Sequence, residues 1–226
     1  MGVISAPAEL DFAIGMAKPP DLFELRLDRL AQSPLHSQSA AELIDRFETK
    51  ISKLRAPLII TARHPMEGGV NRLSTPQRLD LLCRFLSRAR YIDIELRSAS
   101  AFDSLLRLAR KQKVHRIISV HHLKSTPSPG RLRTQAHAAK THGAEIFKVA
   151  TRTDTPAQLM RLIDFATAKN VDIPISAMGI GELGGASRLL LACCGSTLMY
   201  VSLGRSDIQG QMSLEQFRAF GTAPSR

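Results

Sequence analysis

Short apolar segments of β character alternate with stretches of helical period along the 226 residues of this chain. Strands are predicted at 3–5, 22–27, 58–62, 91–96, 116–120, 145–150, 173–177 and 198–203, and helices at 7–17, 39–53, 75–89, 99–112, 130–141, 155–168, 184–194 and 213–220. Eight β/α units in a chain of this size favour a (β/α)₈ TIM barrel, with an open doubly wound sheet as the alternative. Because no composition shift divides the chain, we expect a single domain spanning residues 1–226.

The charge balance points to an anionic ligand. Lys and Arg number 31 against 20 Asp and Glu, a net charge of +11, which concentrates anions near the protein. The basic residues are scattered, aromatic residues make up 5% and Trp is absent, so nucleic acid is not the expected partner. No apolar stretch is long enough to span a membrane. The N-terminus has no basic segment typical of a secretory signal.

The cysteines indicate a reducing compartment. Cys83 stands alone, and Cys193 and Cys194 are adjacent, which gives neither a disulfide framework nor the CxxC spacing of zinc and redox sites. We therefore expect a cytoplasmic protein without a metal site.

Charged residues gather at the ends of the second and third predicted strands. Glu24, Arg26 and Asp28 alternate with leucines, so we expect them on one face, pointing into the barrel. Arg63 ends the third strand, and Glu67 follows it just before two glycines. Because the chemistry of a (β/α)₈ barrel lies at the carboxyl ends of its strands, these residues are predicted to line one mouth.

The next two strands continue this pattern. Asp93 and Glu95 share a face of the fourth strand, while Ser119 and His121 share a face of the fifth. A histidine at a strand end has a pKa near neutrality and is suited to general acid–base catalysis. His122 is expected to point away from the interior.

Lys148 interrupts an apolar run in the sixth strand. A lysine inside a barrel loses hydration, which disfavours its charged form and leaves a nucleophilic amine for Schiff-base chemistry with a carbonyl. The alternative is a permanent ion pair with a carboxylate such as Glu24 or Glu95. The residues by themselves leave both interpretations open.

A glycine-rich loop after the seventh strand, MGIGELGGASR, leads into a helix near Ser187 and Arg188. Free backbone amides, a helix N-terminus and an arginine together favour an anion site. The loop lacks the GxGxxG pattern of a dinucleotide site. After the eighth strand, Gln211 is placed to hold a polar group over the mouth, whereas Gly210 is equally explained by a simple turn.

As a set, these motifs resemble type I 3-dehydroquinate dehydratase, the Schiff-base enzyme of the shikimate pathway. The resemblance rests on ELRLD after the second strand, R-x-x-x-EGG after the third, D-x-E on the fourth, S-x-H on the fifth, the lysine of the sixth, MGIGELGGASR after the seventh and GQ-x-S before the last helix. The motifs occur in the family's order and cover about residues 22–213.

The resemblance implies a role for each candidate residue. Lys148 would form an imine with the ketone of 3-dehydroquinate, and His121 would remove a proton from the neighbouring carbon and protonate the departing hydroxyl, giving 3-dehydroshikimate. Glu67 would orient the histidine, and Arg188 would clamp the substrate carboxylate. The implied remaining contacts are Glu24 and Arg26 to substrate hydroxyls, Arg63 and Gln211 completing the pocket, and a lid at 206–211 that includes Asp207.

The chain departs from the family pattern in two places. His122 and Leu123 stand where an acidic and an aromatic residue are usual, and Asp207 and Gln209 stand where the lid has a small hydroxyl residue and a proline. An aspartate near a carboxylate substrate is unfavourable unless it turns away. We expect these changes to alter affinity and rate more than the type of reaction.

The family also implies that no cofactor or metal is needed, and its members are often dimers, so we expect a homodimer whose partner is a small-molecule substrate. Two alternatives are another Schiff-base barrel such as an aldolase, which would share the strand lysine but not the ELRLD and SR motifs, and a non-catalytic descendant that binds an anion. Retention of both Lys148 and His121 argues against the second.

Overall fold

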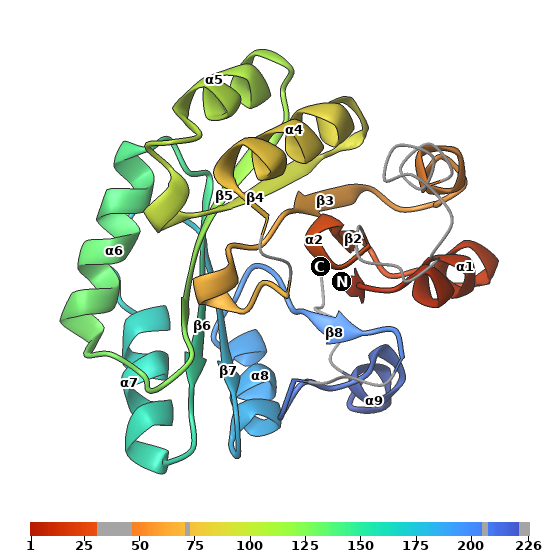
Figure 1. Cartoon of the computed structure of the whole chain (residues 1–226). Helices are drawn as coiled ribbons and strands as arrows, with labels where there is room; N and C mark the ends of the chain where they lie inside the picture. Colours follow the sequence, from red (N-terminus) through yellow and green to blue (C-terminus); the bar gives the residue numbers. More distant parts are fainter. Residues whose placement is uncertain (31–46, 71–72, 205–207, 222–226) are drawn as a thin grey trace.

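The computed structural model describes residues 1–30, 47–70, 73–204 and 208–221. Eight parallel strands form one sheet in the order β7-β6-β5-β4-β3-β2-β1-β8 (Figure 1). Their bounds are β1 Gly2–Ile4, β2 Phe23–Arg26, β3 Leu58–Thr61, β4 Tyr91–Glu95, β5 His115–His122, β6 Ile146–Arg152, β7 Ile175–Ile180 and β8 Val201–Ser202. Every predicted strand is present, although several boundaries differ.

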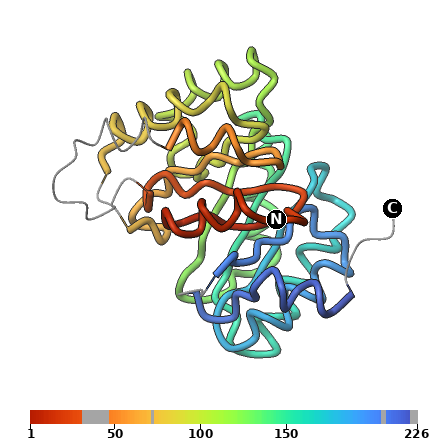
Figure 2. Tube along the Cα trace, turned by 90° about the vertical axis from the view of Figure 1, so that its right-hand side faces the viewer, coloured from red at the N-terminus to blue at the C-terminus, as the bar shows by residue number. Residues whose placement is uncertain are grey.

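The sheet curls until its two edges meet. The N-terminal strand β1 pairs with β8, so the red N-terminal part of the chain lies beside the blue C-terminal part in Figure 2. The two edges of the sheet are β7 and β8. They are joined by hydrogen bonds between β7 and the segment that leads into β8. The Thr197 amide donates to the Ile175 carbonyl at 2.8 Å, and the Ser176 hydroxyl donates to the Leu198 carbonyl at 2.9 Å. The (β/α)₈ barrel is confirmed, and the open-sheet alternative is wrong.

The eighth strand is much shorter than the predicted 198–203. Side chains take up the carbonyls that a longer strand would pair in a ladder: Ser176 donates to Leu198, and the Arg188 guanidinium donates to the Tyr200 carbonyl at 2.7 Å. The regular strand is therefore limited to Val201–Ser202. The segment before it, which includes Thr197 and Leu198, contacts β7 through separate hydrogen bonds.

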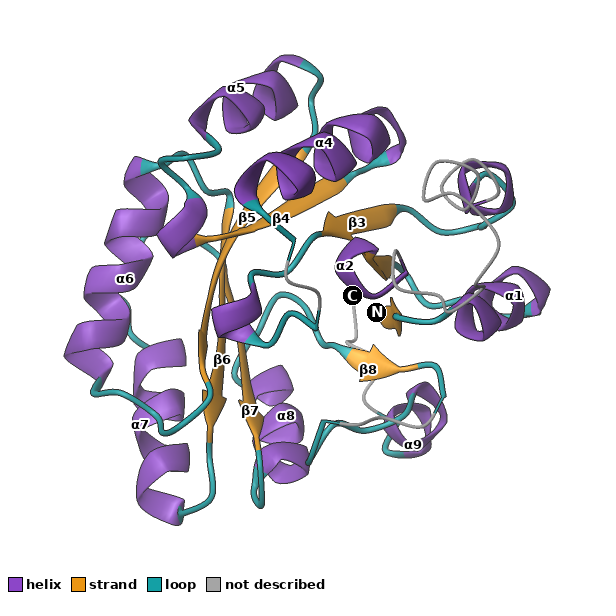
Figure 3. Ribbon diagram, in the orientation of Figure 1, coloured by secondary structure: helices purple, strands orange, loops and turns teal. Residues whose placement is uncertain are grey.

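Helices surround the strands on the outside of the curl (Figure 3). They are α1 Pro7–Gly15, α2 Leu27–Leu30, α4 Thr75–Phe85, α5 Asp103–Lys111, α6 Pro129–Thr141, α7 Pro156–Ala166, α8 Gly184–Cys193 and α9 Leu214–Ala219, with short 3₁₀ turns η1 Pro65–Glu67, η2 Leu86–Arg88 and η3 Leu96–Ser98. The helix predicted at 39–53 begins outside the described residues and is helical over 47–51. Among the described helices, none has both the length and the apolar character needed to cross a bilayer.

Three helices begin at a residue whose side-chain hydroxyl caps the helix. The hydroxyls of Ser74, Thr155 and Ser213 each accept the amide three residues further on, at 3.4, 3.4 and 3.1 Å. In each case a glutamine at that third position bonds back to the cap's amide. These capping boxes satisfy donors that would otherwise be free at a helix start.

Two other predictions about strands are wrong in detail. The second strand ends at Arg26, and the chain turns into α2, so Asp28 does not continue an inward row. The seventh strand, predicted at 173–177, begins at Ile175 and runs to Ile180. Pro174 has no amide hydrogen for a ladder, whereas Gly179 and Ile180 continue the pairing with β6.

The predicted alternation of side chains decides where the polar residues lie. Residues such as Leu25, Ile118 and Val149 pack outward against the helices, in the main apolar core. Inside the barrel, a smaller apolar cluster that includes Ile59 and Ile117 occupies the amino end of the strands. The charged side chains therefore meet at the carboxyl end, the end where barrel enzymes carry their sites.

Candidate active site

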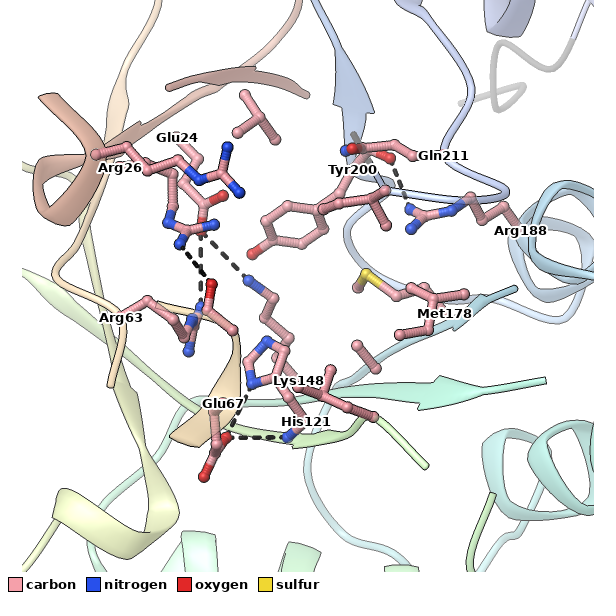
Figure 4. Close-up of a pocket in the computed structure, with 17 residues that line it drawn as sticks. Glu24, Arg26, Arg63, Glu67, His121, Lys148, Met178, Arg188, Tyr200 and Gln211 are labelled. Atoms are coloured by element: carbon pink, nitrogen blue, oxygen red, sulfur yellow. Dashed lines mark hydrogen bonds and ion pairs between the residues drawn. The ribbon is translucent and has the colours of Figure 1, made fainter. Parts of the chain in front are cut away.

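A cavity of about 280 Å³ opens at the carboxyl end of the strands (Figure 4). Eight of the nine side chains predicted for the site line it: Glu24, Arg26, Arg63, Glu67, His121, Lys148, Arg188 and Gln211. The ninth, Asp207, lies outside the described residues. Side chains from six different β/α units thus converge on one space.

Lys148 lies at the centre of this group and is 3% exposed. Its Nζ is 2.8 Å from Asp93 Oδ2 and 3.3 Å from Glu24 Oε1. The predicted contact with Glu24 is present, but the one with Glu95 is not, and Asp93 takes its place. The lysine is therefore both buried and paired with carboxylates, so features of both interpretations of the sequence are present.

Asp93 bonds several groups of the site besides Lys148. It also accepts from Arg63 Nη2 at 2.9 Å and from the Ser119 hydroxyl at 2.6 Å. Burial by itself would raise the pKa of Asp93, but the charges of Arg63 and Lys148 outweigh it and hold that pKa well below its usual value. Asp93 is therefore an anion at any pH at which the protein works.

Glu95 is held by two arginines instead of the lysine. Arg63 Nη1 lies 3.2 Å from Glu95 Oε1, and Arg78, a fully buried residue of α4, bonds the second oxygen. Arg78 also donates to the Ala62 carbonyl at 2.7 Å, and its guanidinium lies 5.0 Å from the centre of the Phe102 ring. Arg78, from the helix layer, thus holds Glu95 in place, and Glu95 in turn holds Arg63.

We expect replacement of Arg78 with alanine to destabilise the barrel strongly. Removing one partner of a buried ion pair leaves Glu95 short of a cation, which typically lowers the free energy of unfolding by about 3–5 kcal/mol. Arg84, on the same helix, pairs with Glu48 with both side chains 33% exposed, so R84A should lower it by no more than about 1 kcal/mol. Urea unfolding of both variants measures the contrast, and equal losses would contradict this role of Arg78.

His121 and Glu67 form the pair that the motifs suggested. His121 Nδ1 is 2.9 Å from Glu67 Oε2, and the same oxygen accepts the His121 amide at 3.0 Å. The carboxylate contact assigns the proton to Nδ1, which leaves the lone pair of Nε2 for the cavity. Burial lowers the pKa of His121 well below 6.5, and the charges of Arg63 and Lys148 lower it further. A neutral imidazole results.

A short turn delivers Glu67 to the histidine. The turn η1 begins at Pro65, shortly after β3 ends at Thr61, and it ends at Gly68 in the left-handed region at φ 89°. His122, the next residue on β5, bonds Gln135 of α6 at 2.9 Å. The predicted opposite orientations of the two neighbouring histidines are therefore confirmed.

Glu67 gives the site a measurable pH dependence. Burial raises the pKa of Glu67 to about 7, so this side chain is protonated below that pH and a carboxylate above it. If the carboxylate supports His121, kcat/KM falls as the pH drops through about 7. We expect Glu67→Gln to remove this acidic limb and to lower kcat on the order of 10- to 100-fold.

Glu145→Gln is the matched control for this prediction. Glu145 makes a similar contact with a histidine, 2.8 Å from His115 Nδ1, at the opposite end of the barrel. A pH profile of kcat/KM should be unchanged in this variant. Persistence of the same acidic limb in Glu67→Gln would refute the assignment.

Arg188 is a buried cation on α8, 2% exposed. Its Nη1 donates to a backbone carbonyl, its Nε has no hydrogen-bond partner, and it forms no ion pair with the described residues. Burial lowers the pKa of Arg188 to about 10, which still leaves it charged at neutral pH. A buried positive charge without an acid favours an anionic ligand.

Four backbone amides of the loop predicted for this anion site already have partners. The amides of Gly181, Glu182, Leu183 and Gly184 are all used within the protein, as donors to Gln209, Asp154, Thr153 and Gly181 in that order. Helix α8 begins at Gly184, the first residue of the predicted range 184–194, so Ser187 and Arg188 lie within its first turns. Of the groups predicted for the anion site, the Arg188 side chain still has an uncommitted donor, its Nε.

The described part of the lid segment packs on this loop. The backbone carbonyl of Gln209 accepts a hydrogen bond from the Gly181 amide at 2.9 Å. The side-chain Nε2 of Gln209 donates to Glu182 Oε1 at 2.6 Å. Gly210 has φ 78°, and a Cβ there would lie 2.5 Å from the Gly181 carbonyl oxygen. Glycine is needed at this turn, which brings Gln211 to the cavity.

Arg26 is tied to its own strand end. Its Nε and Nη2 reach the two oxygens of Asp28 at 2.9 and 2.8 Å. Burial would raise the pKa of Asp28, but the hydrogen bonds and charge of Arg26 lower it. Asp28, the last residue of the predicted charged row, therefore orients Arg26.

Sequence reasoning missed Tyr200, whose ring lies under the lysine. Lys148 Nζ is 3.8 Å from the centre of this ring (Figure 4). The sequence offered only a weak indication of this role, because Tyr200 is one of two tyrosines and lies within an apolar predicted strand.

Across the described ranges, no group of three or more His, Cys, Asp or Glu side chains is arranged to hold a metal ion.

Comparison with known proteins agrees with this geometry. The model of the family "Type I 3-dehydroquinase" matches residues 7–221. The chain belongs to this family. Its members are hydro-lyases, so the prediction of an enzyme is confirmed.

Individual relatives match over most of their own length. The 3-dehydroquinate dehydratases of Pyrococcus abyssi and Methanothermobacter thermautotrophicus are 31% and 32% identical, each over 88% of this chain and over 85% and 82% of the relative. The crystal structure of 3-dehydroquinate dehydratase from Aquifex aeolicus superposes with a TM-score of 0.80 at 25% identity, covering 96% of this chain and 95% of that one.

Proposed function

We propose that this chain dehydrates 3-dehydroquinate to 3-dehydroshikimate in the shikimate pathway, through an imine on Lys148 with His121 as general acid and base. The observation that carries the proposal is that Lys148, His121 and Arg188 line a single cavity in a member of the type I family. A nucleophile, a base and an anion-binding group are the three elements that such a reaction on a keto acid needs.

The first step is attack by the Lys148 amine on the substrate ketone. The amine must be neutral to attack, so Nζ loses a proton, a carbon–nitrogen bond forms, and the ketone oxygen leaves as water. The product is a positively charged iminium. Asp93 and Glu24, which lie 2.8 and 3.3 Å from Nζ, are placed to stabilise that charge as they stabilise the ammonium.

His121 performs the second step. The iminium withdraws electrons from the neighbouring carbon, whose proton the neutral imidazole removes through Nε2. The resulting enamine expels the hydroxyl group, to which the imidazolium returns the proton. Glu67, bonded to Nδ1, holds the ring and stabilises its charged form. Hydrolysis of the imine then releases the product and regenerates the lysine.

The other side chains of the cavity orient the substrate. Arg188 would bind the carboxylate, because it is a buried cation that lacks an acidic partner among the described residues. Glu24 and Arg26 would contact substrate hydroxyls, and Arg63 and Gln211 would complete the pocket. Asp207 stays a prediction for the lid.

The departures from the family pattern fall at the edge of the cavity. His122 turns to α6 and bonds Gln135, while Leu123 is 43% exposed and lines the opening. Gln209 is bonded to Glu182 at the rim. None of these contacts involves Lys148, which supports an unchanged reaction with altered affinity.

The experiment that tests the function is an ultraviolet assay with 3-dehydroquinate. The conjugated enone of 3-dehydroshikimate absorbs where the substrate does not, so its appearance measures turnover directly. We expect turnover from the purified chain. Absence of the enone would overturn the proposal, and an imine that forms with a different ketone would favour the aldolase alternative.

We also propose that the enzyme works as a homodimer in the cytoplasm. Support for the compartment comes from Cys83, Cys193 and Cys194, which are all free. The dimer rests on the family resemblance. Sedimentation velocity would test it, and a single monomeric species at micromolar concentration would count against it.

A further inference from the structure

Tyr200 carries a buried hydroxyl that nothing in the structure uses. The side chain is 3% exposed, lines the cavity, and its Oη has no hydrogen-bond partner. Buried polar groups without a partner are rare and costly in native proteins. Figure 4 shows this hydroxyl pointing into the cavity, toward the side where the amine of Lys148 lies. An orphan donor aimed into an active-site cavity indicates a ligand atom.

The position of the ring ties this hydroxyl to the reacting nitrogen. Lys148 Nζ lies 3.8 Å from the ring centre, which is a cation–π contact with the ammonium. The hydroxyl oxygen is at the rim of the same ring. A carbon bonded to Nζ would therefore bring its own oxygen substituent close to Tyr200.

The charges around Nζ decide which way a ketone oxygen turns. Asp93 and Glu24 lie 2.8 and 3.3 Å from the nitrogen, and their negative charges repel a partly negative carbonyl oxygen. The Arg63 guanidinium is already bonded to Asp93, Glu95 and Ser119. Among the described residues that contact Lys148, Tyr200 is the one whose donor is uncommitted.

We propose that the Tyr200 hydroxyl donates a hydrogen bond to the ketone oxygen of the substrate as Lys148 attacks, and to the same oxygen in the carbinolamine. This inference rests on the proposed imine chemistry and adds a catalytic residue to it. The carbon–nitrogen bond forms from the Nζ lone pair, the carbon–oxygen π bond opens onto the oxygen, and Tyr200 keeps its proton throughout. The oxygen later leaves as water after gaining protons.

The chemistry of the tyrosine suits this role. Burial, together with the nearby charges of Glu24 and Asp93, raises the pKa of Tyr200 well above 10, so the hydroxyl remains a donor at neutral pH. A donor fixed where negative charge develops stabilises the transition state without reorganisation. The ring face, in turn, remains in contact with the nitrogen when it becomes a cationic iminium.

Tyr200→Phe tests the proposal because it removes the hydroxyl and keeps the ring. We expect rapid-quench trapping of the imine from 3-dehydroquinate with borohydride to become on the order of 10- to 100-fold slower, as for loss of one such donor. The final amount of label should match wild type, since the lysine is intact. Tyr91→Phe is the matched control, because Tyr91 lies at the amino end of β4 and stacks on His115; its trapping rate should not change.

A spectroscopic measurement separates a catalytic role from a structural one. The chain has two tyrosines and no tryptophan, so in Tyr91→Phe the near-ultraviolet tyrosine band belongs to Tyr200 alone. Addition of 3-dehydroquinate should shift this band to longer wavelength, as expected when a phenol donates a hydrogen bond. A merely structural residue would show no such shift.

The outcomes distinguish this inference from the proposed function. If wild type becomes labelled and Tyr200→Phe is trapped within twofold of its rate, the role of Tyr200 is wrong and the imine mechanism stands. If wild type itself takes no label, both fail. Slower trapping together with a shift of the Tyr200 band supports the proposal.

Discussion

Replacement of Lys148 with arginine is expected to reduce kcat for 3-dehydroquinate by a factor on the order of 10⁴ or more. Removal of a covalent nucleophile has effects of this size, and a guanidinium stays protonated and cannot form an imine. Arginine retains the positive charge that faces Asp93 and Glu24. The fold should therefore survive, and the enone assay would report the lost chemistry.

Two further variants make this result interpretable. Lys148→Ala removes both amine and charge, so it should be equally inactive and less stable than the arginine variant. Lys140→Arg, on the exposed face of α6 where Lys140 pairs with Asp172, should retain wild-type turnover. Thermal unfolding of all three establishes folding. Turnover of Lys148→Arg within tenfold of wild type would rule out an essential imine.

His121→Asn should separate imine formation from dehydration. We expect kcat to fall by about 10³-fold, the typical contribution of a general acid–base group, while borohydride still labels the enzyme in the presence of substrate. Asparagine preserves a donor toward Glu67, which bonds His121 at 2.9 Å. The stalled imine should accumulate and be visible by mass spectrometry.

The neighbouring histidine provides the control. His122 follows His121 on the same strand but bonds Gln135 of α6, so His122→Asn should keep kcat within about threefold of wild type, since it touches none of the reacting groups. If kcat fell by a similar factor in both variants, the substitutions would be disturbing strand β5 as a whole, and the loss would not report on the imidazole of His121.

Side-chain periodicity explains why so much of this site was predictable. In a parallel barrel, alternate residues of each strand face inward and the carboxyl ends meet. Glu24, His121 and Lys148 could therefore be assigned to one mouth from their positions alone. The contact between His121 and Glu67 came from the family resemblance, and the turn η1 realises it.

Contacts across the barrel were not predictable in the same way. Periodicity places Asp93 and Glu95 on one face but does not say which of them a lysine reaches. The choice depends on Arg78, which enters from helix α4 and takes Glu95. That leaves Asp93 for Lys148. A strand pattern carries no information about an arginine on a distant helix.

Competition for backbone groups explains the remaining errors. The glycine-rich loop was expected to offer free amides, but Gln209 and Asp154 fold back onto it and take two of them. The eighth strand was expected to be longer, but Arg188 takes the carbonyl of Tyr200. Both effects arise from residues distant in sequence, and the second also places the phenol of Tyr200 beneath Lys148.

The central claim is that Lys148 forms an imine with 3-dehydroquinate, and peptide mass spectrometry after borohydride reduction tests it most directly. The account predicts that the wild-type enzyme gains the mass of one reduced ligand and that the peptide containing Lys148 carries it. A labelled peptide that lacks Lys148, or active enzyme that is never labelled, would contradict the account.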